Sequence, residues 1–234
     1  LTSDGTNWIS SPNSAFNPST VLNFYEEFYG YFASTSGYVG QTGWAISSNT
    51  VQAFTNLTTT SNNHPGVIQS AQLTTGVGFL SLALGQPVST LYNIVLGGGA
   101  ITLNFIINIA TLSTVTNTYT LYVGLGRGVG SASEATDGVY FAYTNSLNSG
   151  NWVGKTANAS SRSSANSAVA VSAGSWVNLG ITVNAAATSV GFFVNGVQIA
   201  NSPLAANIPT AALVPHLQMI WSNGTVAAGS VLID

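Results

Sequence analysis

The chain of 234 residues contains no cysteine, so it has neither a disulfide framework nor a thiolate metal site. Charge is almost as scarce, because only 4% of the residues are Asp, Glu, Lys or Arg, against about 25% in an ordinary soluble domain. The three basic residues are Arg127, Lys155 and Arg162. Nucleic-acid binding requires a basic surface, so this composition excludes DNA and RNA as expected partners.

Long apolar runs are missing too, with one exception at residues 93–112, NIVLGGGAITLNFIINIATL. The segment is long enough to span a bilayer, but it contains three consecutive glycines and the asparagines Asn93, Asn104 and Asn108. We interpret it as two strands around a turn and expect no membrane insertion. The chain as a whole is 45% hydrophobic with a net charge of -3, a balance that predicts a folded protein and not a disordered one.

Strand-like alternation runs through most of the chain, whereas a sustained helical period is absent. In ITLNFIINIA, five apolar residues from Ile101 to Ile109 fall on one face, and Thr102, Asn104 and Asn108 fall on the other. The dipeptide Asn195-Gly196 separates two alternating runs and favours a type I′ hairpin turn. Residues 175–200 are therefore predicted to form a three-stranded meander.

About a dozen short strands with turn signals between them indicate two packed antiparallel sheets. The other expected strands cover residues 20–29, 38–46, 66–70, 77–84, 118–124, 138–144, 150–156, 167–171, 212–221 and 225–233. We predict an all-β, two-sheet antiparallel jelly-roll sandwich over residues 19–234. Residues 1–18, which include LTSDGTNWIS, are interpreted as a junction from an upstream anchoring segment, with Trp8 and Ile9 docking onto the domain or a neighbouring subunit.

Four segments in order resemble bacteriophage virion proteins with a concanavalin-like jelly-roll module: HPGVIQSAQLTTGVGF (64–79), DGVYFAYTNSLNSGNWVGKTAN (137–158), SAGSWVNLGITVNAAATSVGFFVNGVQIA (172–200) and IPTAALVPHLQMI (208–220). The segment LTSDGTNWIS separately resembles a short sequence that is common in phage fibre proteins. The resemblance implies a structural module, not an enzyme, on the virion surface. It also implies a homo-oligomer, generally a trimer, with other virion proteins as partners. A lectin-like module for a host surface glycan is the alternative, and a glucanase-like enzyme is a further one.

Carbohydrate binding would use aromatic faces together with amide and hydroxyl groups. Tyr38 and Trp44 lie in an aromatic-rich stretch, while Asn151 and Trp152 follow the polar segment TNSLNSGN. We take these four residues as the candidate glycan contacts. Packing of the rings in the core or between subunits is the competing interpretation.

Carboxylates offer two further hypotheses. Glu134 and Asp137 lie in the Gly/Ser-rich stretch GRGVGSASEATDG and are candidate calcium ligands; a solvated turn is the alternative. Glu26 and Glu27 could supply glycosidase chemistry, but adjacent strand residues point to opposite faces, so the two cannot form the catalytic pair. With only two imidazoles in the chain, a zinc site is not expected.

Overall fold

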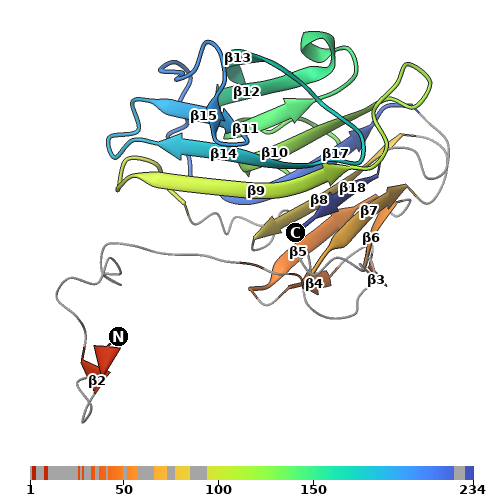
Figure 1. Cartoon of the computed structure of the whole chain (residues 1–234), viewed down its shortest axis with the longest axis horizontal. Coiled ribbons are helices and arrows are strands. Elements are labelled where there is room, and N and C mark those ends of the chain that lie inside the picture. Colours follow the sequence, from red (N-terminus) through yellow and green to blue (C-terminus); the bar gives the residue numbers. More distant parts are fainter. Residues whose placement is uncertain are drawn as a thin grey trace.

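The protein is described here from a computed structural model, whose described residues are 2–3, 8–9, 26, 28, 33–34, 37–40, 42–49, 52–56, 66–72, 77–84, 94–223 and 230–234. Within them, two eight-stranded antiparallel sheets pack face to face, which confirms the predicted jelly-roll sandwich (Figure 1). Among the described segments, no helix is long and apolar enough to cross a membrane.

The first sheet, called sheet I below, has the strand order β13-β12-β11-β10-β17-β8-β5-β4. Its strands are β4 (Gly37–Val39), β5 (Trp44–Ser48), β8 (Gly78–Leu84), β10 (Tyr119–Arg127), β11 (Asp137–Tyr143), β12 (Asn151–Asn158), β13 (Ser161–Ala170) and β17 (Val214–Trp221). A 3-10 helix, η1 (Leu147–Gly150), joins β11 to β12.

The second sheet, sheet II, has the order β16-β15-β14-β9-β18-β7-β6-β3. Its strands are β3 (Ala33–Ser34), β6 (Gln52–Asn56), β7 (Ile68–Gln72), β9 (Ile101–Ile109), β14 (Trp176–Val183), β15 (Val190–Val194), β16 (Val197–Gln198) and β18 (Val231–Ile233). Neighbours in both sheets are often distant in sequence: β10 pairs with β17, and β9 pairs with β14.

The core fills the space between the two sheets with alternate residues of each strand. Phe141 of sheet I lies edge-on to Phe192 of sheet II, with 5.3 Å between ring centroids. Gly154 makes this contact possible, because a Cβ at that position would lie 2.4 Å from Cγ of Phe192. Burial of such large apolar side chains, at roughly 25 cal/mol per Å² removed from water, is the main force that holds the sheets together.

The meander predicted for residues 175–200 is confirmed as β14, β15 and β16. Asn195 and Gly196 form its second turn with φ of 50° and 78°, the left-handed conformation that the dipeptide predicts. Asn195 also donates its backbone N–H to the carbonyl of Asn178 at 2.8 Å. The first turn is held by the side chain of Asn184, which accepts from the backbone of Thr188 at 2.8 Å.

Two predictions about strands need correction. Residues 93–112 were expected to form two strands around a turn, but only β9 is a full strand, and Ile94 makes an isolated bridge to Leu213. Residues 38–46 were expected to form one strand, but they belong to the hairpin β4–β5, with Gly40 and Gly43 at positive φ between the strands. The alternation of apolar and polar residues does not reveal this turn, because aromatic residues lie on both sides of it.

Near the start of the chain, β1 (Thr2–Ser3) pairs with β2 (Trp8–Ile9). Ser3 lies opposite Trp8, so this segment has a strand partner of its own (Figure 1). The division at residue 18 and the docking of Trp8 and Ile9 stay predictions.

Candidate functional site

The four aromatic and amide residues predicted to contact a glycan do not form one site. Trp44 lies on β5 and Trp152 on β12, and β11, β10, β17 and β8 separate these strands in sheet I. Both indoles face the core, with exposed fractions of 7% and 1%. Tyr38, on the edge strand β4, is 59% exposed. The structure therefore does not bring Tyr38, Trp44, Asn151 and Trp152 into one site.

Packing explains the burial of Trp152. Its ring lies 6.1 Å from the ring of Phe141 and 5.8 Å from that of Tyr143, centroid to centroid, inside the sandwich. Aromatic pairs in such edge-on or tilted arrangements contribute about 0.5–1.5 kcal/mol beyond their buried area. The competing interpretation, in which this indole belongs to the core, is the one that holds.

The two candidate calcium ligands are engaged with groups of the protein. Glu134 forms ion pairs with Lys155 at 2.8 Å and Arg162 at 3.3 Å. Asp137 accepts hydrogen bonds from the backbone of Ala159 and the hydroxyl of Thr136, both at 2.9 Å. The described part of the chain contains no group of three or more His, Cys, Asp or Glu side chains placed to hold a metal ion. A calcium site at Glu134 and Asp137 has no support in this arrangement.

The remaining candidate acids and imidazoles are dispersed. Glu26 accepts from the backbone N–H of Thr42 at 3.0 Å and from its hydroxyl, while Glu27 and His64 lie outside the described residues. His216 is fully enclosed, and burial lowers its pKa to about 4.

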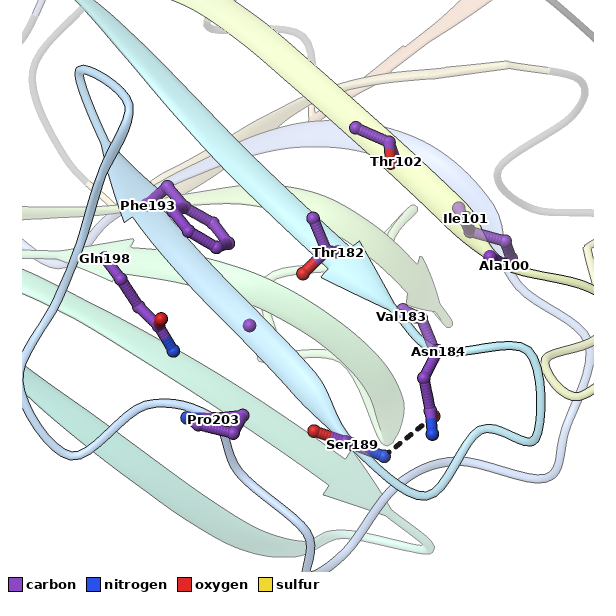
Figure 2. A pocket seen from close by; sticks show the side chains of 11 residues that line it. Ala100, Ile101, Thr102, Thr182, Val183, Asn184, Ser189, Phe193, Gln198 and Pro203 are labelled. Carbon is purple, nitrogen blue, oxygen red and sulfur yellow. Dashed lines mark hydrogen bonds between the residues drawn. The ribbon is translucent and has the colours of Figure 1, made fainter.

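The described surface is hollowed on the outer face of sheet II, across β9, β14, β15 and β16. One hollow of about 390 Å³ is adjoined by a second of about 180 Å³, and Thr102, Thr182 and Phe193 line both. Figure 2 shows Phe193 between Gln198 and Thr182, with Asn184 and Ser189 at one end. We call this continuous depression the outer groove.

Strand register explains why these residues meet. Asn104 of β9 lies opposite Gly180 of β14, and Gly180 lies opposite Phe193 of β15. Phe193 in turn pairs with Gln198 of β16. One row of side chains thus crosses four strands at the normal interstrand spacing of about 4.8 Å. An adjacent row contains Thr102, Thr182 and Gly191.

Two glycines make room for the Phe193 ring on the outer face of sheet II. A Cβ on Gly180 would lie 3.3 Å from Cβ of Phe193, and one on Gly191 would lie 3.0 Å from its ring and 2.6 Å from the hydroxyl of Thr182. Side chains at these positions would fill the space beside the ring. Their absence leaves a half-buried phenyl face in the floor of the groove.

The groove offers hydrogen bonding without charge. Its lining is composed of amides, hydroxyls, glycines and a few apolar groups, without an Asp, Glu, Lys or Arg. Such a surface matches a ligand that carries many hydroxyl groups and an apolar ring face, and it has no electrostatic attraction for an ion.

The residues of the groove were missed at the level of sequence, although part of the signal was present. Alternation in 176–183 places Asn178, Gly180 and Thr182 on the polar face of one strand. Nothing local indicates that β9, about seventy residues earlier, pairs with this strand. Phe193 also breaks the pattern, because it is an aromatic residue on the solvent side.

A family model described as SO2946-like, C-terminal domain, matches residues 63–234. No curated protein sequence matches the chain. The crystal structure of a protein of unknown function, SO2946 from Shewanella oneidensis MR-1, has a TM-score of 0.61 at 15% identity over 98% of this chain and 93% of that one. The potassium-bound carbohydrate recognition domain of Emp46p has a TM-score of 0.50 at 10% identity over 81% and 85%. At these sequence identities, the two similarities show a shared fold.

Proposed function

The chain belongs to the SO2946-like, C-terminal domain family, and we propose that it is a carbohydrate-binding module whose outer groove holds an uncharged glycan. The observation that carries the proposal is the row formed by Asn104, Phe193 and Gln198, in which a half-buried phenyl ring lies between two amides. A sugar ring can stack its apolar face on the phenyl group while the amides bind its hydroxyls.

The fold supports the same function. The Emp46p domain is by its name a carbohydrate recognition domain, and it shares this sandwich architecture. A shared fold does not transfer a ligand, so the proposal depends on the groove. Of the hypotheses drawn from the sequence, it takes up the lectin-like alternative and moves the site from sheet I to sheet II.

Binding of neutral oligosaccharides to the wild type and to Phe193→Ala tests the proposal. A glycan array screens cello-, malto-, manno- and galacto-oligosaccharides, and isothermal titration calorimetry measures the hits. Loss of the ring should weaken binding by about tenfold, the equivalent of about 1.4 kcal/mol. Tyr38→Ala is the matched control, because it removes an exposed aromatic ring from sheet I and should leave the affinity unchanged.

Two results would reject the proposal: no neutral glycan binds at millimolar concentration, or Phe193→Ala and Tyr38→Ala lower the affinity equally. A virion location, trimeric assembly, partnership with other virion proteins and lack of enzymatic activity are separate predictions from the sequence resemblance. Light scattering of the purified chain tests the trimer.

A further inference from the structure

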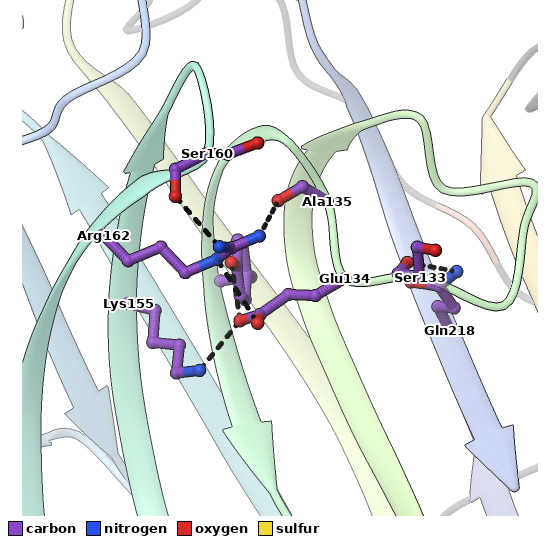
Figure 3. A network of polar contacts seen from close by, with 8 residues as sticks. Ser133, Glu134, Ala135, Lys155, Ser160, Arg162 and Gln218 are labelled. Carbon is purple, nitrogen blue, oxygen red and sulfur yellow. Dashed lines mark hydrogen bonds and ion pairs between the residues drawn. The ribbon is translucent and has the colours of Figure 1, made fainter. Parts of the chain in front are cut away.

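Three of the nine charged side chains of this protein meet on the outer face of sheet I. Two of the three basic residues of the chain, Lys155 of β12 and Arg162 of β13, bind the same carboxylate, that of Glu134 (Figure 3). Glu134 lies in the loop of residues 128–136 that joins β10 to β11. All three side chains remain partly accessible, with exposed fractions between 13% and 29%.

One phenol hydroxyl also contacts this carboxylate. Tyr140 donates its hydroxyl to Oε1 of Glu134 at 2.9 Å. Burial, with the negative charge of Glu134 as a further cause, raises the pKa values of Tyr140 and Tyr122, so both remain protonated donors. Two cations and a phenol therefore converge on one carboxylate, which leaves a net positive charge once Glu134 is counted. Charge-assisted contacts, here from Nζ of Lys155 and Nε of Arg162, are typical of carboxylate recognition.

A second observation lies beneath the same loop. Ser81, His216 and Gln218 are fully enclosed on the outer face of sheet I, where polar side chains would otherwise meet solvent. The Ser81 hydroxyl and Oε1 of Gln218 have no hydrogen-bond partner among the described residues. Both ring nitrogens of His216 lie close to the backbone of Gly124 and Val214 without a hydrogen bond of normal geometry. Buried polar atoms left in this state are unfavourable, because they have given up their hydrogen bonds to water.

Hydrogen bonds, ion pairs and buried apolar side chains hold the loop over His216 and Gln218. Nε2 of Gln218 donates to the carbonyls of Val129 at 2.8 Å and Ser131 at 2.6 Å. Nε2 of Gln218 also donates to the carbonyl of Ser133 at 3.3 Å, and Arg162 donates to the carbonyl of Ala135 at 3.0 Å. The backbone of Thr136 donates to the carbonyl of Arg127 and accepts from Ser160, and Glu134 adds its ion pairs. Val129 and Ala135 are buried in the apolar cluster on this face. Val129 and the imidazole of His216 lie close together beside Gly126, where an added Cβ would meet both within 2.9 Å.

We propose that Lys155, Arg162 and Tyr140 form a binding site for the carboxylate of an acidic sugar, and that Glu134 occupies this site when no ligand is bound. The ligand carboxylate takes the place of the Glu134 carboxylate, and the loop of residues 128–136 lifts from sheet I. Ser81, His216 and Gln218 then become available to the sugar hydroxyls. This site is on the opposite sheet from the outer groove and does not depend on the neutral-glycan proposal.

Calorimetry with oligogalacturonate, and with its fully methyl-esterified form as the uncharged counterpart, tests the proposal. Glu134→Gln removes the competing charge and should tighten binding of the acidic oligomer about tenfold. Arg162→Gln should weaken it at least about tenfold. Arg127→Gln removes the remaining basic side chain of the chain and serves as the matched control, with no expected change.

Hydrogen exchange on the unmodified protein gives a second measurement, which does not depend on the folding of Glu134→Gln. Saturating acidic oligomer should increase exchange of the backbone amides of residues 129–135 at least about threefold, whereas the ester should not. The proposal is overturned if the ester binds as tightly as the acid, if Arg162→Gln and Arg127→Gln behave alike, or if the loop amides are unchanged at saturation. None of these outcomes involves Phe193, so failure of this proposal would not affect the neutral-glycan proposal at the outer groove.

Discussion

The outer faces of the two sheets carry different chemistry on one sandwich. The outer face of sheet II is open, and its groove is lined by amides, hydroxyls and the Phe193 ring without a charged group. The outer face of sheet I holds Glu134, Lys155 and Arg162, and a loop of the chain itself lies over its polar row. The first face suits uncharged ligands, because it has no charge to compensate the desolvation of an ion. The second face suits anions, because its cations compensate that cost.

The largest expected effect is a loss of stability in acid, which arises from His216 on the outer face of sheet I. The pKa of His216 is about 4 in the folded protein, below the ordinary value of about 6.5. Between these values the unfolded chain binds a proton that the folded chain does not, so stability falls as pH falls. Lowering the pH from 7 to 4 should remove about 3 kcal/mol of the free energy of unfolding, measured by urea denaturation.

Comparison of variants at the two histidines isolates the contribution of His216 to the pH dependence of stability. His216→Gln should abolish most of the pH dependence between 6.5 and 4, whereas His64→Gln should retain it. Equal pH profiles for the two variants would mean that the acid sensitivity arises elsewhere.

The next effect concerns the attachment of the loop. Gln218→Ala removes the amide that binds Val129 and Ser131, and it should lower the free energy of unfolding by about 2 kcal/mol because the loop carbonyls lose their donor. Gln198→Ala, an exposed glutamine on sheet II, should change it by less than about 0.5 kcal/mol. Thermal or urea unfolding gives both values. Similar losses would show that the loop is held by other contacts.

A smaller effect concerns the open face. Gly191→Ala places a methyl group against Thr182 and the Phe193 ring and should lower neutral-glycan affinity about tenfold in calorimetry. Gly98→Ala, where nothing lies within 4 Å of the added Cβ, is the control with unchanged affinity. Retained binding in Gly191→Ala would move the sugar away from this part of the groove.

The smallest expected effect is a difference between the two faces in how ligand affinity depends on salt. Raising sodium chloride from about 0.05 M to 0.5 M shortens the Debye length, so binding of an acidic oligomer at sheet I should weaken several-fold. Binding of a neutral oligomer at the groove should stay within about twofold. Calorimetry at both salt concentrations compares them, and a parallel decline would contradict the assignment of different chemistry to the two faces.

Much of the fold follows from local pattern. Alternation places Ile107 and Leu179 inside, and Asn195-Gly196 specifies its turn, because strand period and left-handed backbone preferences are properties of neighbouring residues. The candidate site was not predictable in the same way. Trp152 and Phe193 are both aromatic residues in alternating strands, yet one is enclosed and the other lines the groove.

The sequence by itself determined the all-β class, the scarcity of charge and the meander of residues 175–200, since each depends on composition or on contacts a few residues apart. Tertiary structure alone decided which strands are neighbours. It brought Asn104 beside Gly180 and Phe193, and it placed Lys155 and Arg162 on the carboxylate of Glu134. The physical reason is that long-range strand pairing depends on how two whole sheets bury their apolar faces, which no single segment encodes.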